Sequence, residues 1–145
     1  MKPASDTELR SRLRAAGLRA TLPRVAVLRQ LTEAGAPLAH GEVADALAPL
    51  GFDRATVYRN LIDLTEAGFA RRSDLGDHVW RFELVRGATD HTPAAHPHFV
   101  CSECGTVACL PEAAVAVRPS RGAPRALRRK AAVEIQVRGV CDGCA

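Results

Sequence analysis

The sequence predicts an α+β protein with two small domains: a helical N-terminal domain that ends in a β-hairpin, and a small C-terminal α/β domain that contains a metal. Three observations lead to this prediction. Helical periodicity fills most of residues 8–67, two short strands follow it, and all five cysteines lie at or after position 101. The length of 145 residues suits one domain or two small ones.

The first two helices are predicted from their ends. Residues 8–16 form a short amphipathic helix that Gly17 ends. The segment 21–24 opens the second helix, because Thr21 can cap it and a proline in the first turn needs no N–H. The buried face of this helix is expected to consist of Val25, Leu28 and Leu31. The helix should end near residues 34–35.

A third and a fourth helix complete the helical part. The third begins at Ala39 or His40 and ends before Pro49. Asp53 caps the fourth, which covers residues 54–67 and ends at Gly68. Its buried stripe is made of Val57, Leu61 and Leu64, whereas Arg54, Tyr58 and Arg59 lie off that stripe.

A β-hairpin follows these helices. Its strands cover residues 69–73 and 79–83, and the turn contains residues 75–77. Helices followed by a two-stranded hairpin are typical of a winged helix-turn-helix domain, in which the helix after the turn enters the DNA major groove. The hairpin would then lie on the DNA backbone. Polar residues 86–95 read as a hinge between a DNA-binding domain, 1–85, and a second domain, 96–145.

The second domain is expected to be a small sheet with little helix. Short strands are predicted over residues 99–101, 106–110 and 133–140, and a short helix over residues 125–130. So short a segment cannot bury a large core, so a bound metal and dimer contacts should help to stabilise it.

Charge and composition narrow the class of partner. The chain has 20 basic and 16 acidic residues, and residues 1–30 contain seven basic side chains against two acidic ones. A basic segment on a compact fold favours a phosphate partner, here double-stranded DNA, because an aromatic content of 4% argues against stacking on single strands. No apolar run is long enough for a membrane span, and no signal-peptide core is present, so a cytoplasmic location is expected.

Two CxxC motifs give the strongest chemical signal. They are Cys101-x-x-Cys104 and Cys141-x-x-Cys144. Paired CxxC motifs typically place four thiolates around one tetrahedral Zn²⁺, and a closed shell of four thiolates leaves no position for catalysis. We therefore predict a structural zinc site. The alternative is a set of buried or redox-active cysteines.

A second, regulatory metal site is predicted close to the hinge. Its candidate ligands are the HxH pair His96 and His98, the wing residue Glu83 and the fifth cysteine, Cys109. Two further candidates are His40, at the start of the third helix, and His78, in the wing. The alternatives are solvent-facing histidines, a helix-capping His40, an ordinary wing glutamate and a small core cysteine.

Four segments also match a known family. They are residues 17–24 (GLRATLPR), 54–61 (RATVYRNL), 82–84 (FEL) and 96–105 (HPHFVCSECG), together with the closing CxxC. In combination they resemble the ferric uptake regulator (Fur) family of bacterial metal-responsive repressors. The resemblance covers most of the chain, and few other families combine the ATVYR segment with HxH and CxxC.

The resemblance implies a winged-helix domain joined by a hinge to an α/β dimerisation domain. In this family the Tyr and Arg of ATVYR contact DNA, and a basic residue before the second helix reaches the minor groove. Those residues are Tyr58, Arg59 and Arg19 here. Arg54 and Thr56 lie in the same segment and are included in the expected DNA interface.

The resemblance also implies Glu83, His96 and His98 as ligands of the regulatory metal. Two positions depart from the family: Cys109 stands where an acidic residue is usual, and Pro37 stands where a His is usual, with His40 three residues later. Pro97 and Val133 occupy the positions of a further family metal site, which is therefore expected to be absent. The segment 111–130 also lacks the long helix common in the family.

These features together predict a homodimeric, metal-dependent repressor. A thiolate beside imidazoles favours zinc over iron(II), so zinc is the preferred sensed metal, with iron or peroxide sensing and nickel or manganese sensing as alternatives. No small organic substrate and no membrane partner are expected. A zinc hydrolase lacks a positioned general base here, and a zinc-ribbon adaptor that binds only protein does not explain the basic N-terminal segment.

Overall fold

The computed structural model describes residues 4–85, 97–110, 116–128 and 135–145. The chain divides into two compact units, Met1–Val85 and Arg86–Ala145. Each unit has its own sheet and is described by itself. The expected hinge, 86–95, lies outside the described residues, as does His96.

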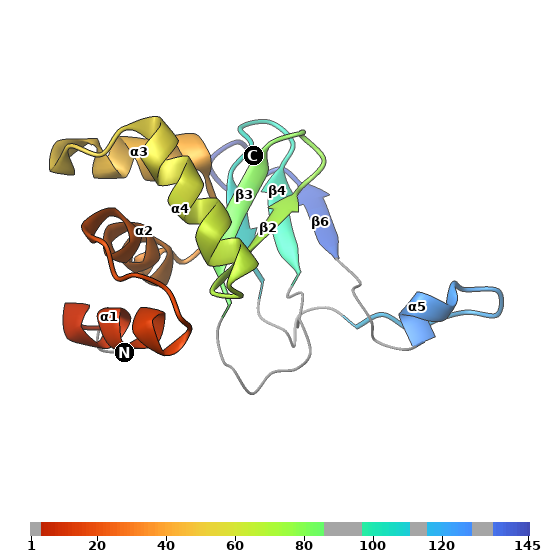
Figure 1. Cartoon of the computed structure of the whole chain (residues 1–145). Coiled ribbons are helices and arrows are strands. Elements are labelled where there is room, and N and C mark those ends of the chain that lie inside the picture. The colour runs from red at the N-terminus through yellow and green to blue at the C-terminus, as the bar shows by residue number, and fades with distance from the viewer. Residues whose placement is uncertain (1–3, 86–96, 111–115, 129–134) are drawn as a thin grey trace. The chain divides into compact units, whose positions relative to one another are not determined.

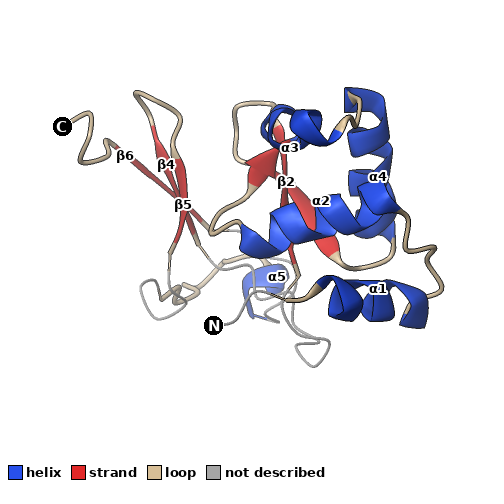
Figure 2. Cartoon of the chain, turned by 90° about the vertical axis from the view of Figure 1, so that its left-hand side faces the viewer, coloured by secondary structure: helices blue, strands red, loops and turns tan. Residues whose placement is uncertain are grey.

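Unit 1 contains the predicted helices (Figure 1). Their bounds are α1 (Asp6–Ala15), α2 (Leu22–Glu33), α3 (His40–Leu47) and α4 (Arg54–Glu66), and a 3₁₀ turn, η1 (Ala48–Leu50), follows α3. The stripes predicted from periodicity form the core: Val57, Leu61 and Leu64 of α4 are fully buried, together with Leu28 of α2. The α2 and α4 helices pack on the sheet of this unit (Figure 2).

The starts of α1 and α2 differ from the sequence prediction in detail. Ser5 caps α1 by accepting a hydrogen bond from the backbone N–H of Glu8, so this helix begins two residues earlier than predicted. Thr21 occupies the predicted N-cap position of α2, but its side chain does not make the expected capping hydrogen bond. The reason is local, because Pro23 stands in the first turn and removes one of the N–H groups that a cap side chain can bind.

The sheet of unit 1 has three strands, whereas the sequence indicated two. Strands β2 (Ala70–Asp74) and β3 (Trp80–Leu84) form the predicted hairpin, and β1 (Leu38–Ala39) pairs antiparallel with the other side of β3. A strand of two residues shows no periodicity, so the sequence carries no signal for it. Because β1 runs directly into α3, it fixes the start of α3 beside the wing.

In its described residues, unit 2 consists of a small three-stranded sheet and one short helix. Strand β4 (His98–Cys101) lies between β5 (Val107–Cys109), which is antiparallel to it, and β6 (Gln136–Gly139), which is parallel to it. The helix α5 covers Arg125–Arg128. Within the described part of the chain, these elements agree with the predicted strands and short helix. Residues 133–134, the start of the predicted last strand, and 129–130, the end of the predicted helix, lie outside it.

None of the helices among the described residues is both long and apolar enough to cross a membrane.

Candidate metal centre and nucleic-acid interface

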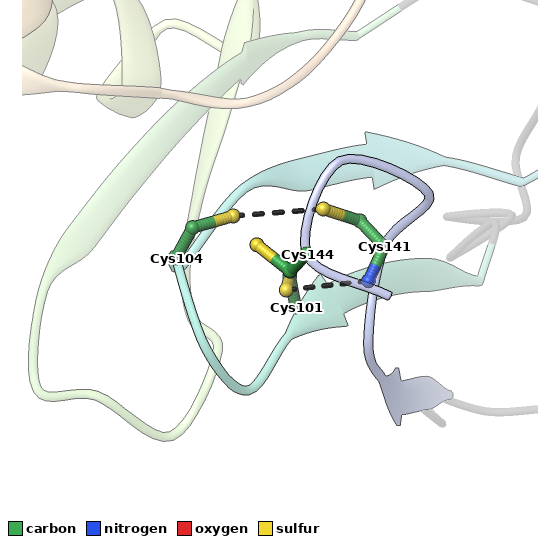
Figure 3. Close-up of side chains that lie close together, drawn as sticks. All are labelled: Cys101, Cys104, Cys141 and Cys144. Atoms are coloured by element: carbon green, nitrogen blue, oxygen red, sulfur yellow. Dashed lines mark hydrogen bonds between the residues drawn. The ribbon is translucent and has the colours of Figure 1, made fainter.

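The two CxxC turns meet because of the sheet topology of unit 2. Strands β4 and β6 are parallel neighbours, and Cys101 lies opposite Gly139 in their register. The chain therefore leaves both strands at the same end of the sheet. Cys104 lies in the turn after β4, and Cys141 and Cys144 lie in the turn after β6 (Figure 3).

The four sulfur atoms form a tight cluster. All four lie within 4.8 Å of one another, and the Sγ atoms of Cys104 and Cys141 are 3.7 Å apart. A tetrahedron of sulfurs around Zn²⁺ at about 2.3 Å has sulfur–sulfur edges of about 3.8 Å. The cluster thus has the ligand type, the ligand number and the size that a zinc ion needs.

Hydrogen bonds shift the pKa values of these thiols in opposite directions. Backbone N–H groups of Cys104 and Cys141 lower the pKa of Cys101 to about 6, and the N–H of Cys141 lies 3.4 Å from the Cys101 sulfur. Sulfur contacts with Cys104 and Cys141 raise the pKa of Cys144 to about 12. Four thiols this close cannot all ionise without a cation, so the cluster is built to hold positive charge.

A second pair of possible metal ligands lies at the other end of β4. His98 and Cys109 are directly opposite each other in the β4–β5 ladder. Directly opposite residues project from the same face of a sheet, with Cβ atoms typically about 5 Å apart. An imidazole and a thiol are therefore placed side by side. Beyond this pair, the backbone N–H of Leu110 donates a 2.8 Å hydrogen bond to the carbonyl oxygen of Pro97, which is the last bond of the ladder at this end among the described residues.

The candidate ligands of unit 1 have three different settings. Glu83 lies in β3, and its Oε1 accepts a hydrogen bond of 2.6 Å from Nε of Arg71. His40 donates from Nε2 to the carbonyl oxygen of Arg54 at 2.8 Å. His78 lies at the hairpin tip with a positive φ of 59° and a side chain that is 96% exposed, and its Nδ1 lies 3.8 Å from Asp74. Within unit 1 these three residues do not form one cluster.

The predicted recognition helix presents a polar face. Asp53 caps α4 by accepting the N–H of Thr56 at 2.7 Å, and this bond lowers the pKa of the Asp53 carboxyl. The stripe that includes Val57 faces the core, which leaves Tyr58 41% exposed and Arg59 exposed beside it. This face is available for contact with the edges of bases in the major groove.

Two other predicted DNA-binding arginines lie at the start of this helix and in the segment before α2. Arg54 is exposed, and its guanidinium donates a 2.6 Å hydrogen bond to Asp45. Arg19 is exposed just before α2, and its backbone carbonyl accepts a 3.0 Å hydrogen bond from the guanidinium of Arg24. Arg24 in turn pairs with Asp63, which ties the segment before α2 to α4.

One exposed pair was not singled out by sequence reasoning. The guanidinium of Arg72 in β2 lies 4.5 Å from the ring centre of Trp80 in β3. The only available signal was the single tryptophan of the chain at the start of a strand, and strand periodicity alone gives such a residue no role.

Comparison with known proteins gives the family. The sequence model of the ferric uptake regulator family matches residues 15–126. The chain belongs to the ferric uptake regulator family. The members of this family are metal-responsive transcription regulators, so the protein is a regulator and not an enzyme, and the predicted family and α+β fold are confirmed.

Individual relatives include more than one kind of regulator. The ferric uptake regulation protein of Legionella pneumophila is 33% identical over 135 residues, which cover 91% of this chain and 95% of that protein. A peroxide-responsive repressor of Staphylococcus aureus is 32% identical over 97 residues, which cover 66% of this chain and 61% of that protein. The ferric uptake regulator of Vibrio cholerae, whose crystal structure is known, has 26% sequence identity to this chain. The two structures match with a TM-score of 0.64, over 91% of this chain and 98% of that one.

Proposed function

We propose that this protein is a zinc-responsive, homodimeric repressor of metal-homeostasis genes. The observation that carries the choice of metal is the placement of Cys109 directly opposite His98 in the small sheet. A thiolate beside an imidazole is a softer ligand pair than the carboxylate and imidazole ligands that suit iron(II). Such a repressor would act in the cytoplasm, on chromosomal DNA.

The proposal assigns the four-cysteine cluster to a structural zinc ion. Its sulfur spacing fits one tetrahedral ion, and the four thiolates fill the coordination shell. Among its described residues, unit 2 buries few apolar side chains, those of Pro97, Val100 and Cys101. The ion would therefore contribute much of the free energy of folding of this unit.

The sensing ion is assigned to a separate site. Its proposed ligands are Glu83 of unit 1 and three residues of unit 2, His96, His98 and Cys109, with His40 or His78 as a further ligand. An ion that takes ligands from both units would restrict the angle between them. In a dimer this angle sets the spacing of the two α4 helices, which must match successive turns of the major groove.

The energy needed for this switch is moderate. Raising the DNA-binding conformation from ~1% to ~99% requires about 5.5 kcal/mol of differential binding of the ion to that conformation. An ion bound equally well by both conformations would change nothing.

The proposed DNA interface consists of residues on and beside α4, with one basic residue before α2. They are Tyr58 and Arg59 on the exposed face of the helix, Arg54 and Thr56 in its first turn, and Arg19. Two observations support this assignment: Tyr58 and Arg59 are exposed, and the neighbouring Val57 is buried in the core. The Vibrio regulator, whose fold this chain shares, is described as having DNA-binding domains.

A second candidate is an iron- or peroxide-responsive regulator, because the Staphylococcus relative is named as a peroxide-responsive repressor. The two candidates make different predictions for metal-depleted protein that keeps its structural zinc. Zinc at buffered nanomolar levels should promote binding to a duplex that the protein has selected from random sequence. If only iron(II) promotes binding, and peroxide abolishes it, the second candidate is correct.

A further inference from the structure

The wing carries an aromatic–cation pair at its exposed end. Trp80 is the only tryptophan of the chain, and 49% of it is exposed. The guanidinium of Arg72 lies 4.5 Å from the centre of its ring, a geometry that holds the cation by attraction to the ring face. Leaving so large an apolar surface in water has a free-energy cost, which favours a binding role for this pair.

The other two arginines of the wing strands, Arg71 and Arg81, are paired with carboxylates. Arg71 pairs with Glu83, and Arg81 forms two hydrogen bonds of 2.9 and 2.7 Å with the carboxylate of Asp77. Asp74, which is opposite Trp80 in the ladder, accepts the backbone N–H groups of Gly76 and His78. Within the described residues, Arg72 has no carboxylate within salt-bridge distance.

Trp80 lies at the end of unit 1 at which α4 begins, near the exposed side chain of Tyr58. The ring of Tyr58 meets the ring of His40 with centroids 5.2 Å apart. His40 follows Ala39, which pairs with Arg81, the neighbour of Trp80. Both cartoon views agree, because α4 begins at the end of the unit at which the hairpin turns (Figures 1 and 2).

We infer that Arg72, positioned by Trp80, binds a phosphate of the DNA backbone beside the groove that α4 enters. This inference rests on the proposed function and adds a contact to it. A planar guanidinium suits phosphate oxygens, and the ring limits the rotamers that Arg72 must give up on binding. A phosphate contact adds affinity and orientation but no sequence preference.

The test uses the full-length, zinc-loaded protein with Arg72→Gln, Trp80→Phe and Trp80→Leu variants. Affinity is measured between 50 and 200 mM salt for a selected duplex and for an unrelated one. Arg72→Gln should lower the slope of log K against log salt by about 0.9, so its loss of affinity across this range should be about threefold smaller than that of the wild type. Both duplexes should weaken by the same factor.

The remaining variants separate positioning from general charge. Trp80→Phe keeps a ring and should retain more affinity than Trp80→Leu, and duplex DNA should change the emission of Trp80 in the wild type. Arg121→Gln removes an exposed charge from unit 2 and should leave the slope unchanged. A wild-type slope in Arg72→Gln, an equal fall in Arg121→Gln, or an unchanged Trp80 emission overturns the inference. Failure of the wild type to bind any duplex would instead refute the proposed function.

Discussion

The Nε2 atom of His40 donates a 2.8 Å hydrogen bond to the carbonyl oxygen of Arg54, the first residue of α4. The same ring meets Tyr58 edge-on, with an angle of 66° between the two planes. One side chain at the start of α3 therefore holds both the backbone and an exposed side chain of α4, the proposed recognition helix. Only Nδ1 remains for any metal.

His40→Ala should weaken duplex binding even at saturating zinc, because Tyr58 loses the ring that orients it. His91→Ala removes a histidine from the polar segment 86–95, which has no proposed role in binding, and serves as the control, with binding at saturating zinc close to that of the wild type. Both are measured by fluorescence anisotropy of labelled duplex. Full recovery of His40→Ala at high zinc would mean that His40 acts as a metal ligand and not as a support for α4.

The four-cysteine cluster should be required for the fold of unit 2. Cys101→Ser and Cys144→Ser should each lose one tightly held zinc per chain and should unfold or monomerise this unit, because so few apolar side chains are buried there. Zinc content by elemental analysis and mass by light scattering test this prediction. The assignment fails if both variants keep full zinc and a normal dimer.

Arg59→Ala should weaken DNA binding without changing the fold, because its side chain is exposed on α4. If Arg59 contacts a base edge, specificity should relax at one position at a cost of roughly 1–3 kcal/mol. If it contacts a phosphate, all sequences should weaken together and the salt slope should fall by about one unit. Unchanged affinity for the selected duplex would show that α4 is not the recognition helix.

The wing tip should lose stability in acid. Hydrogen bonds from Arg81 lower the pKa of Asp77 to about 2 in the folded protein. Because this pKa is depressed, the stabilising contribution of the Asp77 carboxylate is fully present above the unfolded pKa near 4. It is lost as the pH falls toward 2. Because the Asp77 side chain is 38% exposed, the contribution should stay under about 1 kcal/mol.

The Asp77→Asn variant tests this contribution. It should be slightly less stable than the wild type at pH 7 and should approach it near pH 2, as measured by urea unfolding. A difference that grows as the pH falls would contradict the assignment.

Features with a local cause were predictable from the sequence. The α4 helix follows from the Asp53 cap and the period of Val57, Leu61 and Leu64, all of which are buried. The cluster of four cysteines was predictable from the paired CxxC spacing, and the parallel pairing of β4 and β6 brings the two turns together.

Features that depend on tertiary contacts were not predictable. Strand β1 has two residues and exists only because β3 offers an open edge. The contact of Arg72 with Trp80 depends on the register of β2 and β3, which makes these two residues diagonal neighbours. The hydrogen bond from His40 to Arg54 depends on how α3 packs on α4. No pattern in the sequence encodes these contacts.

Binding of the selected duplex, titrated against buffered free zinc, iron(II) and manganese(II), tests the central claim most directly. The proteins are the wild type, Cys109→Ala and Cys109→Asp. The wild type should respond to zinc at the lowest free concentration, and Cys109→Ala should keep its structural zinc and its dimer but need much more zinc. Cys109→Asp should respond again, with preference shifted toward iron(II) or manganese(II), because a hard oxygen replaces a soft sulfur. A Cys109→Ala curve that follows the wild type would contradict the proposed zinc-sensing site.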